Sequence, residues 1–254
     1  MSGSATYLYA VTRPVDGSSV SQLRGIGGAP LRVLEVGELG CVVSTVSLDE
    51  FGEEPLQRNL ADLGWLARVA REHDAVVQGL AEVTTAVPLR LGAVYVDDGS
   101  AAVRVARLRA AARATLDVLD GREEWGVKMY AVQPETEPQT VPADRPSSGL
   151  EYLRRRRGEL ARKTIDARAL AEDADAVFEE LRSVSVLARR HRPQDPALSG
   201  VKRPMLLNAA FLVDRDGRPE FHRAVERLAQ ARPEGAVVRT GPWPPYSFAT
   251  LDDA

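Results

Sequence analysis

The chain has 254 residues, of which 44% are hydrophobic and 27% are charged, and its formal net charge is -3. This length and composition predict one large or two modest globular domains, and the charge gives no global reason for binding nucleic acid or an anionic membrane. Cys41 is the only cysteine, so an intrachain disulfide and a cysteine-based zinc cluster are excluded, and a small buried thiol in a reducing cytoplasm is expected.

The first 121 residues predict an α+β domain. Its expected elements are a strand at 7–11, a helical turn at 18–24, a hairpin of 31–36 with 41–46, a helix at about 55–80 and a strand at 84–91. The helix should bury one stripe of residues, namely Leu56, Leu60, Leu63, Leu66, Ala70, Val77 and Leu80. His73 lies beside this stripe, and we expect a hydrogen-bonded residue at the edge of the core rather than a ligand. This order of elements indicates a ferredoxin-like sheet.

A linking helix at 101–119 leads to a second cycle of elements. They are a strand at 125–132, a loop at 133–148, a long helix at about 149–181, strands at 183–190 and 205–213, a helix at 218–231 and a strand at 236–239. A coiled-coil-like seam follows the long helix through Leu150, Leu153, Leu160, Ala167, Ala171, Ala174, Phe178 and Leu181. We therefore expect two tandem domains, 1–121 and 122–254, with ferredoxin-like, βαββαβ-type sheets, packed helices and a long helix in the C-terminal domain.

The segment Thr240–Phe248 forms an aromatic, proline-rich tail. Gly241 and Pro242 should end the preceding strand, because glycine loosens the backbone and proline donates no hydrogen bond to a ladder. The later prolines should hold the tail extended and stiff. Its three aromatic side chains are Trp243, Tyr246 and Phe248. Two interpretations remain: the tail packs across the protein's own core, which we favour, or it forms a docking surface for another protein.

A run of four arginines lies near the start of the long helix. Arg154, Arg155, Arg156 and Arg157 are consecutive, so on a helix they point in several directions and cannot form one flat patch. A solvated first turn with a few surface ion pairs is the favoured interpretation. The aromatic motif of RNA-binding sheets is missing, which argues against nucleic acid, while an acidic partner protein remains an alternative.

The sequence contains little that indicates catalysis, a cofactor or a metal. A glycine-rich dinucleotide motif, a Walker lysine motif, a His-Glu-x-x-His motif and a nucleophile elbow are all missing. His73, His191 and His222 are far apart and have no carboxylate at metal-ligand spacing. No apolar run approaches the roughly 20 residues that span a bilayer, and the first residues lack the features of a signal peptide. A non-enzymatic protein without metal, cofactor or membrane contact is expected.

Blocks along nearly the whole chain resemble the gas vesicle GvpL/GvpF family. The most specific are the strand block Glu-Trp-Gly-Val-Lys at Glu124–Lys128 and the tail block at Gly241–Phe248. The others are Tyr7–Ala10, Trp65 with Arg71–His73, Val87–Gly92, Gly149 with Tyr152–Arg156, and Leu207–Val213. Leu91 stands where the family's Pro-Leu-Arg-Phe-Gly motif has phenylalanine, so a local aromatic contact should be reduced.

The resemblance implies a non-enzymatic minor component of gas vesicles, in the cytoplasm and at the vesicle. Its implied partners are the small hydrophobic shell protein GvpA and other vesicle accessory proteins. We hypothesise that the chain binds GvpA and limits its aggregation during shell nucleation, and the candidate contacts are Trp243, Tyr246, Phe248, Arg154, Arg155 and Arg156. Two alternatives stay open: a small-molecule sensor or enzyme that uses a cleft between the domains, and a scaffold that self-associates through the long-helix seam.

Overall fold

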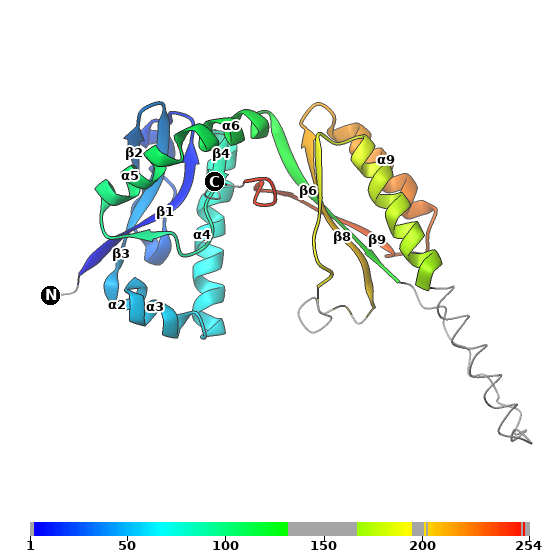
Figure 1. The fold of residues 1–254 in the computed structure, drawn as a ribbon, viewed down its shortest axis with the longest axis horizontal. Helices are drawn as coiled ribbons and strands as arrows, with labels where there is room; N and C mark the ends of the chain where they lie inside the picture. The colour runs from blue at the N-terminus through cyan, green and yellow to red at the C-terminus, as the bar shows by residue number, and fades with distance from the viewer. Residues whose placement is uncertain (1–2, 132–166, 195–200, 202, 250, 252–254) are drawn as a thin grey trace, which may run out of the picture. The chain divides into compact units, whose positions relative to one another are not determined.

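The computed structural model describes residues 3–131, 167–194, 201, 203–249 and 251. The chain forms two compact units, which are drawn in Figure 1: residues 1–124 with 242–254, and residues 125–241. The α+β class with two sheets is therefore confirmed. The units differ from the expected division in two respects: the first boundary follows Glu124 instead of residue 121, and the tail from Pro242 onward packs with the first unit instead of with the second.

The first sheet has the strand order of a ferredoxin-like fold. It contains β1 (Ser4–Thr12), β2 (Arg32–Val36), β3 (Leu39–Ser47) and β4 (Ala86–Pro88) in the order β2-β3-β1-β4, and β5 (Val94–Tyr95) also pairs with β1. All these pairs are antiparallel. The first crossover is short, since it consists of α1 (Gly17–Val20) and the 3-10 turn η1 (Ile26–Gly28). The hairpin and strands β1 to β4 were predicted correctly, because apolar alternation and the intervening glycines mark them, whereas the short β5 was not predicted.

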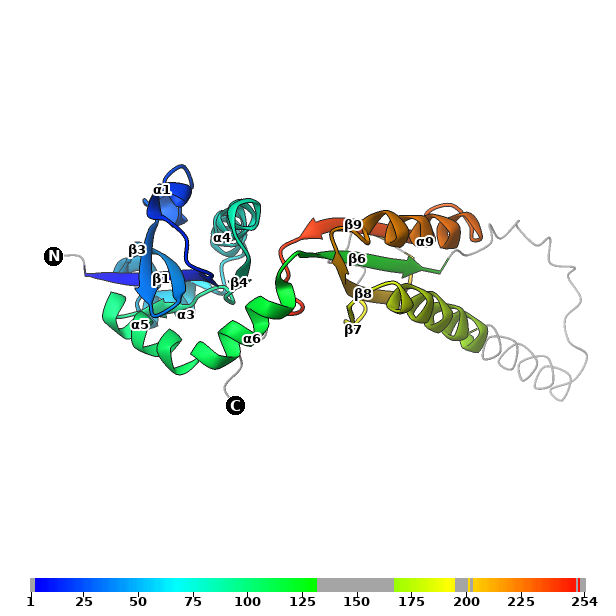
Figure 2. The same ribbon diagram turned by 90° about the horizontal axis from the view of Figure 1, so that it is seen from above.

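Helices lie on both sides of the first sheet. Figure 2 shows α4 (Leu63–Val83) on one side and the pair α5 (Asp98–Arg107) and α6 (Arg109–Leu119) on the other. Strand β1 is buried from Ala5 to Thr12 for this reason. The core on the α4 side includes Tyr7, Tyr9, Val69, Val76 and Leu80. Strand β1 is thus the centre of the unit.

Two helices that were expected to be continuous are broken. The helix expected at 55–80 is divided into α3 (Glu53–Asn59) and α4, preceded by the short α2 (Leu48–Phe51). Asp62 begins α4 because its carboxylate accepts hydrogen bonds from the backbone N–H groups of Gly64 and Trp65. The expected buried stripe was therefore wrong at Leu60 and Leu63, which lie at this corner; Leu63 is 79% exposed. The helix expected at 101–119 likewise bends at Leu108, between α5 and α6.

The second sheet repeats the same strand order. It is formed by β6 (Arg122–Tyr130), β7 (Leu187–Arg190), β8 (Met205–Asp214) and β9 (Val237–Trp243) in the order β7-β8-β6-β9. A helix over residues 167–183 and α9 (Arg218–Gln230) pack on one face. Their shared core is apolar and includes Trp125, Phe178, Leu181, Phe211 and Phe221. The predicted loop at 133–148 and the first half of the predicted long helix lie outside the described residues.

The last strand continues further than predicted. Gly241 and Pro242 were expected to end it, but β9 runs on to Trp243. Gly241 has a φ of 117°, which an L side chain rarely adopts, so glycine lets the strand bend here while the pairing continues. Proline is tolerated because β9 is an edge strand of its sheet.

Candidate partner-binding site

From Pro244 onward the tail forms a compact turn rather than the extended segment that its prolines predict. The backbone N–H of Tyr246 donates to the Pro244 carbonyl at 2.7 Å, and the N–H groups of Phe248 and Ala249 both donate to the Pro245 carbonyl, at 3.0 and 2.9 Å. Each proline supplies a carbonyl acceptor but has no backbone N–H that would need a hydrogen-bond acceptor, so the two prolines favour this tight turn. The expectation of an extended tail therefore holds through Trp243, within β9, and was wrong from Pro244 onward.

Glu124 anchors this turn to the first unit. One carboxylate oxygen of Glu124 accepts from the Ser247 N–H at 2.9 Å, and the other accepts from the Ser247 hydroxyl at 2.6 Å. Glu124 is buried, so these charge-assisted bonds compensate for the water that it loses. The two most specific blocks of the sequence, at 124–128 and 241–248, therefore meet at this contact.

The three tail aromatics differ in exposure. Phe248 is 9% exposed, whereas Trp243 is 46% and Tyr246 is 39% exposed. The Tyr246 hydroxyl donates a long hydrogen bond of 3.4 Å to Asp74, and its ring centroid lies 6.3 Å from that of His73. Burial and the nearby Asp74 carboxylate raise the pKa of Tyr246 well above its usual range. Phe248 thus fastens the tail, while the other two rings remain partly accessible.

A buried polar cluster lies beneath Tyr246. The Tyr7 hydroxyl accepts a hydrogen bond from the Gly92 N–H at 3.0 Å and lies 3.1 Å from His73 Nδ1. Burial raises the pKa of Tyr7 well above its usual range, so the hydroxyl keeps its proton at neutral pH. The tautomer of His73 sets which of the two groups donates in this hydrogen bond.

The protonation of His73 follows from its surroundings. Burial lowers the pKa of His73 to about 4, and the Asp74 charge and the Leu89 backbone oppose this only in part. None of the residues that the structure describes forms a hydrogen bond with Nε2, which is buried. The sequence correctly suggested a hydrogen-bonded histidine of the core, but this residue lies within the core rather than at its edge.

Tyr9 fixes a second part of the cluster. Its hydroxyl lies 2.8 Å from the Ser44 hydroxyl and accepts from the Ile26 N–H at 2.8 Å. Strand β1 shifts register between Leu8 and Ala10, so Tyr9 sits at a β-bulge, a feature that redirects side chains. Gly25 must lack a side chain, because a Cβ there would lie 2.5 Å from the Tyr9 oxygen.

A small pocket adjoins the tail. Its volume is about 250 Å³, and it is lined by the loop Pro88–Ala93 together with Ala249 and Leu251. The loop is held against β1, since the Leu89 N–H donates to the Tyr9 carbonyl at 2.8 Å and the Leu8 N–H donates to the Ala93 carbonyl at 2.9 Å. We call the exposed faces of Trp243 and Tyr246 and this pocket the tail surface.

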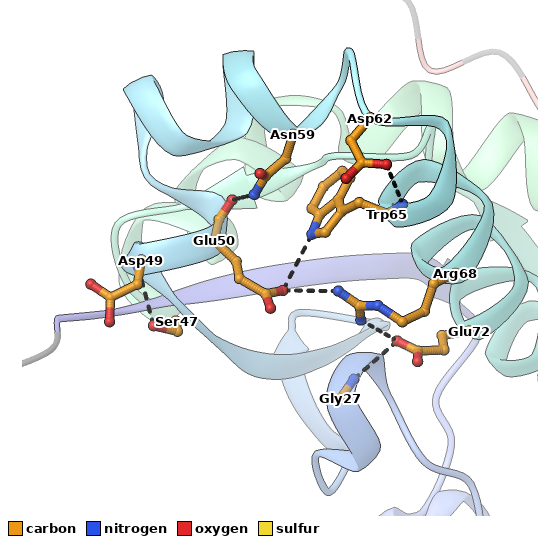
Figure 3. Close-up of polar contacts among 9 residues, drawn as sticks. All are labelled: Gly27, Ser47, Asp49, Glu50, Asn59, Asp62, Trp65, Arg68 and Glu72. Carbon is orange, nitrogen blue, oxygen red and sulfur yellow. Dashed lines mark hydrogen bonds and ion pairs between the residues drawn. The ribbon is translucent and has the colours of Figure 1, made fainter.

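A polar network holds the helix corner of the same unit, as Figure 3 shows. Arg68 joins Glu50 at 3.2 Å and Glu72 at 3.3 Å, and Glu50 also lies 3.4 Å from the indole nitrogen of Trp65. Glu72 accepts from the Gly27 N–H at 3.0 Å. Three of these residues belong to α4, so the helix motif that starts at Trp65 secures α2 and the η1 loop rather than forming a ligand site.

The sequence-predicted contacts separate into two groups. Trp243, Tyr246 and Phe248 lie together on the first unit, and only the first two present substantial surface. The cluster Arg154, Arg155 and Arg156 lies outside the described residues. Sequence analysis missed Glu124 and Tyr7 as supports of the tail surface. Their one signal was membership of the conspicuous blocks, because Glu124 and Ser247 are 123 positions apart.

The geometry of the described residues does not assemble a reaction centre. None of their His, Cys, Asp and Glu side chains gather in threes in a way that could hold a metal ion. Cys41 is buried, as expected, and burial raises its thiol pKa to about 11, which makes a thiolate nucleophile unavailable at neutral pH. None of the described helices combines the length and apolar character that a membrane crossing requires. The described residues thus define a two-unit α+β protein in which the candidate functional site is an exposed surface suited to binding, the tail surface.

Sequence comparison places this class more narrowly. The family model described as "Gas vesicle synthesis protein GvpL/GvpF" matches residues 5–250. Gas vesicle protein L of Streptomyces sp. (strain CB03234) is 42% identical over 252 residues, which are 96% of this chain and 92% of that protein. Gas vesicle protein F of the same strain is 27% identical over 256 residues, 96% of this chain and 99% of that protein. The chain belongs to the GvpL/GvpF family, and these relatives are gas vesicle proteins, not enzymes.

Solved structures share the fold. The crystal structure of the gas vesicle protein GvpF from Anabaena sp. PCC7120 has a TM-score of 0.70 and 20% identity, and the match covers 99% of this chain and 98% of that one. That of GvpF from Microcystis aeruginosa has a TM-score of 0.67 and 20% identity, with coverage of 97% and 99%. The resemblance seen in the sequence blocks is thus confirmed for the family and for the fold.

Proposed function

We propose that this chain binds the hydrophobic gas vesicle shell protein, GvpA, through the tail surface and limits its aggregation while the shell assembles. The observation that supports this most is the uneven burial of the tail: Phe248 and Ser247 fasten it, while Trp243 and Tyr246 keep 46% and 39% of their surface exposed. A segment that is already fixed loses little conformational entropy when it binds. Most of the free energy gained by burying the exposed rings therefore contributes to affinity. Membership of a gas vesicle family supports the choice of a shell protein as the proposed partner.

The physical need for such a protein comes from the shell subunit. Large exposed apolar surface makes a subunit prone to aggregation before it is incorporated. Aromatic rings with a polar handle suit transient cover, because they bury apolar area and still tolerate water when released. Covering roughly 500 Å² contributes on the order of 12 kcal/mol gross, and association costs offset much of this. The complex is therefore reversible.

The test follows GvpA aggregation by light scattering in the presence of purified protein. Wild type should delay aggregation, and Trp243→Ala should shorten the delay and weaken binding without lowering the melting temperature. Val96→Ala is the matched control, because Val96 is also exposed, at 81%, but belongs to another part of the first unit. Wild type that neither binds GvpA nor delays its aggregation would refute the proposal.

Phe248→Ala separates contact from support. Removal of this buried ring should lower the melting temperature and release the tail, so binding is lost together with stability. If Trp243→Ala also lowered the melting temperature as much, its ring would be a packing residue, and the tail surface would not be the contact.

A further inference from the structure

A second concave region of the first unit is lined by none of the residues of the tail surface. It is a pocket of about 520 Å³ between one face of α6 and the loop ends of the first sheet. The helix supplies Arg109, Arg113 and Leu116, which are spaced as one helical face. The opposite wall consists of Arg13, Pro14, Glu38 and Leu39, from the end of β1 and the β2–β3 turn.

The arginines of this pocket are unequally neutralised. Arg13 is paired with Asp117 at 2.9 Å and with Asp120 at 3.7 Å. Among the described residues, Arg113 forms only a long ion pair of 3.9 Å, with Glu38. Arg109 makes no ion pair or side-chain hydrogen bond within the described part of the chain. The pocket therefore carries two guanidinium groups with charge available for a ligand.

The charges of these two arginines repel each other along α6. Arg109 and Arg113 are four positions apart on α6, and like charges at this spacing destabilise a helix by a few tenths of a kcal/mol. Arg109 also lies against the hairpin turn, where a Cβ on Gly37 would be 3.8 Å from its guanidinium. An anionic ligand that bridges the two groups would remove this repulsion and add charge-assisted, bidentate hydrogen bonds.

The floor of the pocket limits the class of ligand. Leu39 and Leu116 are buried apolar residues of the lining, and Pro14 extends the apolar wall. An inorganic anion would satisfy the arginines but would leave this floor and most of the volume unfilled. A ligand that combines carboxylates with an aliphatic group would contact both the arginines and this floor.

We propose that this pocket binds an acidic, leucine-containing segment of a partner polypeptide, with Arg109 and Arg113 holding its carboxylates and the apolar floor holding its aliphatic side chain. This site is separate from the tail surface, so it does not depend on the GvpA proposal. The Glu38 carboxylate repels an acidic ligand and competes with it for Arg113. Replacing Glu38 by a neutral residue should therefore strengthen binding.

The experiment measures fluorescence anisotropy of a labelled, terminally blocked peptide in which leucine and glutamate residues are interspersed, with the full-length chain. Arg109→Ala and Arg113→Ala should each weaken binding about tenfold, the loss expected for one charge-assisted hydrogen bond. Glu38→Gln should strengthen it about twofold to threefold, because an exposed ion pair is weak. Arg223→Ala is the control, since Arg223 is exposed on α9 in the second unit.

Two further arms identify the ligand chemistry. A matched peptide with glutamine in place of glutamate should bind at least tenfold more weakly, and neither inorganic phosphate nor hexanoate should displace the acidic peptide at equal concentration. Displacement by phosphate, or by hexanoate, would overturn the assignment to a polypeptide. Equal binding of the two peptides, or unchanged affinity in both arginine variants, would overturn the site itself.

Discussion

The two units share a strand order but fill their interiors differently. The first buries polar residues around β1, including Thr6, Thr12, Ser44, His73 and Glu124, and all five buried polar residues of the described chain belong to this unit. The second packs Phe178, Phe211 and Phe221 against one another, with ring centroids 5.6 to 5.7 Å apart. Apolar packing supplies stability with loose specificity, whereas directional hydrogen bonds between buried polar groups favour one arrangement. The polar unit is the one that carries the tail surface.

The largest effect is expected from the aromatic interior. Phe211→Ala removes a fully buried ring between two others and should destabilise the second unit by about 3 to 5 kcal/mol. Hydrogen exchange followed by mass spectrometry resolves the two units. Protection should fall in β6, β8 and α9 and stay unchanged in β1 and α4; an equal loss in both would show that the units unfold as one.

The stability of the first unit, with its polar interior, should depend on pH through His73. The pKa of His73 is about 4 in the folded chain and 6.5 in its ordinary state, so the unfolded chain takes up the proton first as the pH falls. Its contribution to stability is complete above about pH 6.5 and is lost toward pH 4, with a total of about 3 kcal/mol. Urea unfolding at several pH values measures this. His73→Gln should be less stable at neutral pH but should lack this slope, and a wild-type stability that stays level from pH 7 to 5 would contradict the assignment.

The smallest effect concerns the helix corner. Asp62→Ala removes the acceptor for the N–H groups of Gly64 and Trp65 and should cost about 1 kcal/mol. Asp62→Asn keeps a capping oxygen and should recover most of it. Thermal unfolding of both variants checks this order, and equal melting temperatures for wild type and Asp62→Ala would mean that the Glu50–Arg68 network holds the corner unaided.

The limits of sequence reasoning lie where distant residues meet. Strands and their order were predictable, because alternation and Gly turns are local signals. The break at Asp62 was missed because Leu60 and Leu63 continue the helical spacing, although Asp62 itself is a good capping residue. The pairing of Glu124 with Ser247 and of Tyr7 with His73 had no local signal, since each joins segments 66 or more positions apart. The sequence likewise does not show that Trp243 is exposed and Phe248 is buried, because burial depends on which residues pack against each ring in the folded chain.

The return of the tail makes residues 125–241 an insertion within the first unit. When residues 1–124 have emerged from the ribosome, Ser247 and Phe248 have not yet been synthesised. Glu124 therefore lacks its hydrogen-bond donor Ser247 until the whole second unit has been translated. The first unit is therefore synthesised first but completes its fold last, and the tail surface forms only after Phe248 has been synthesised.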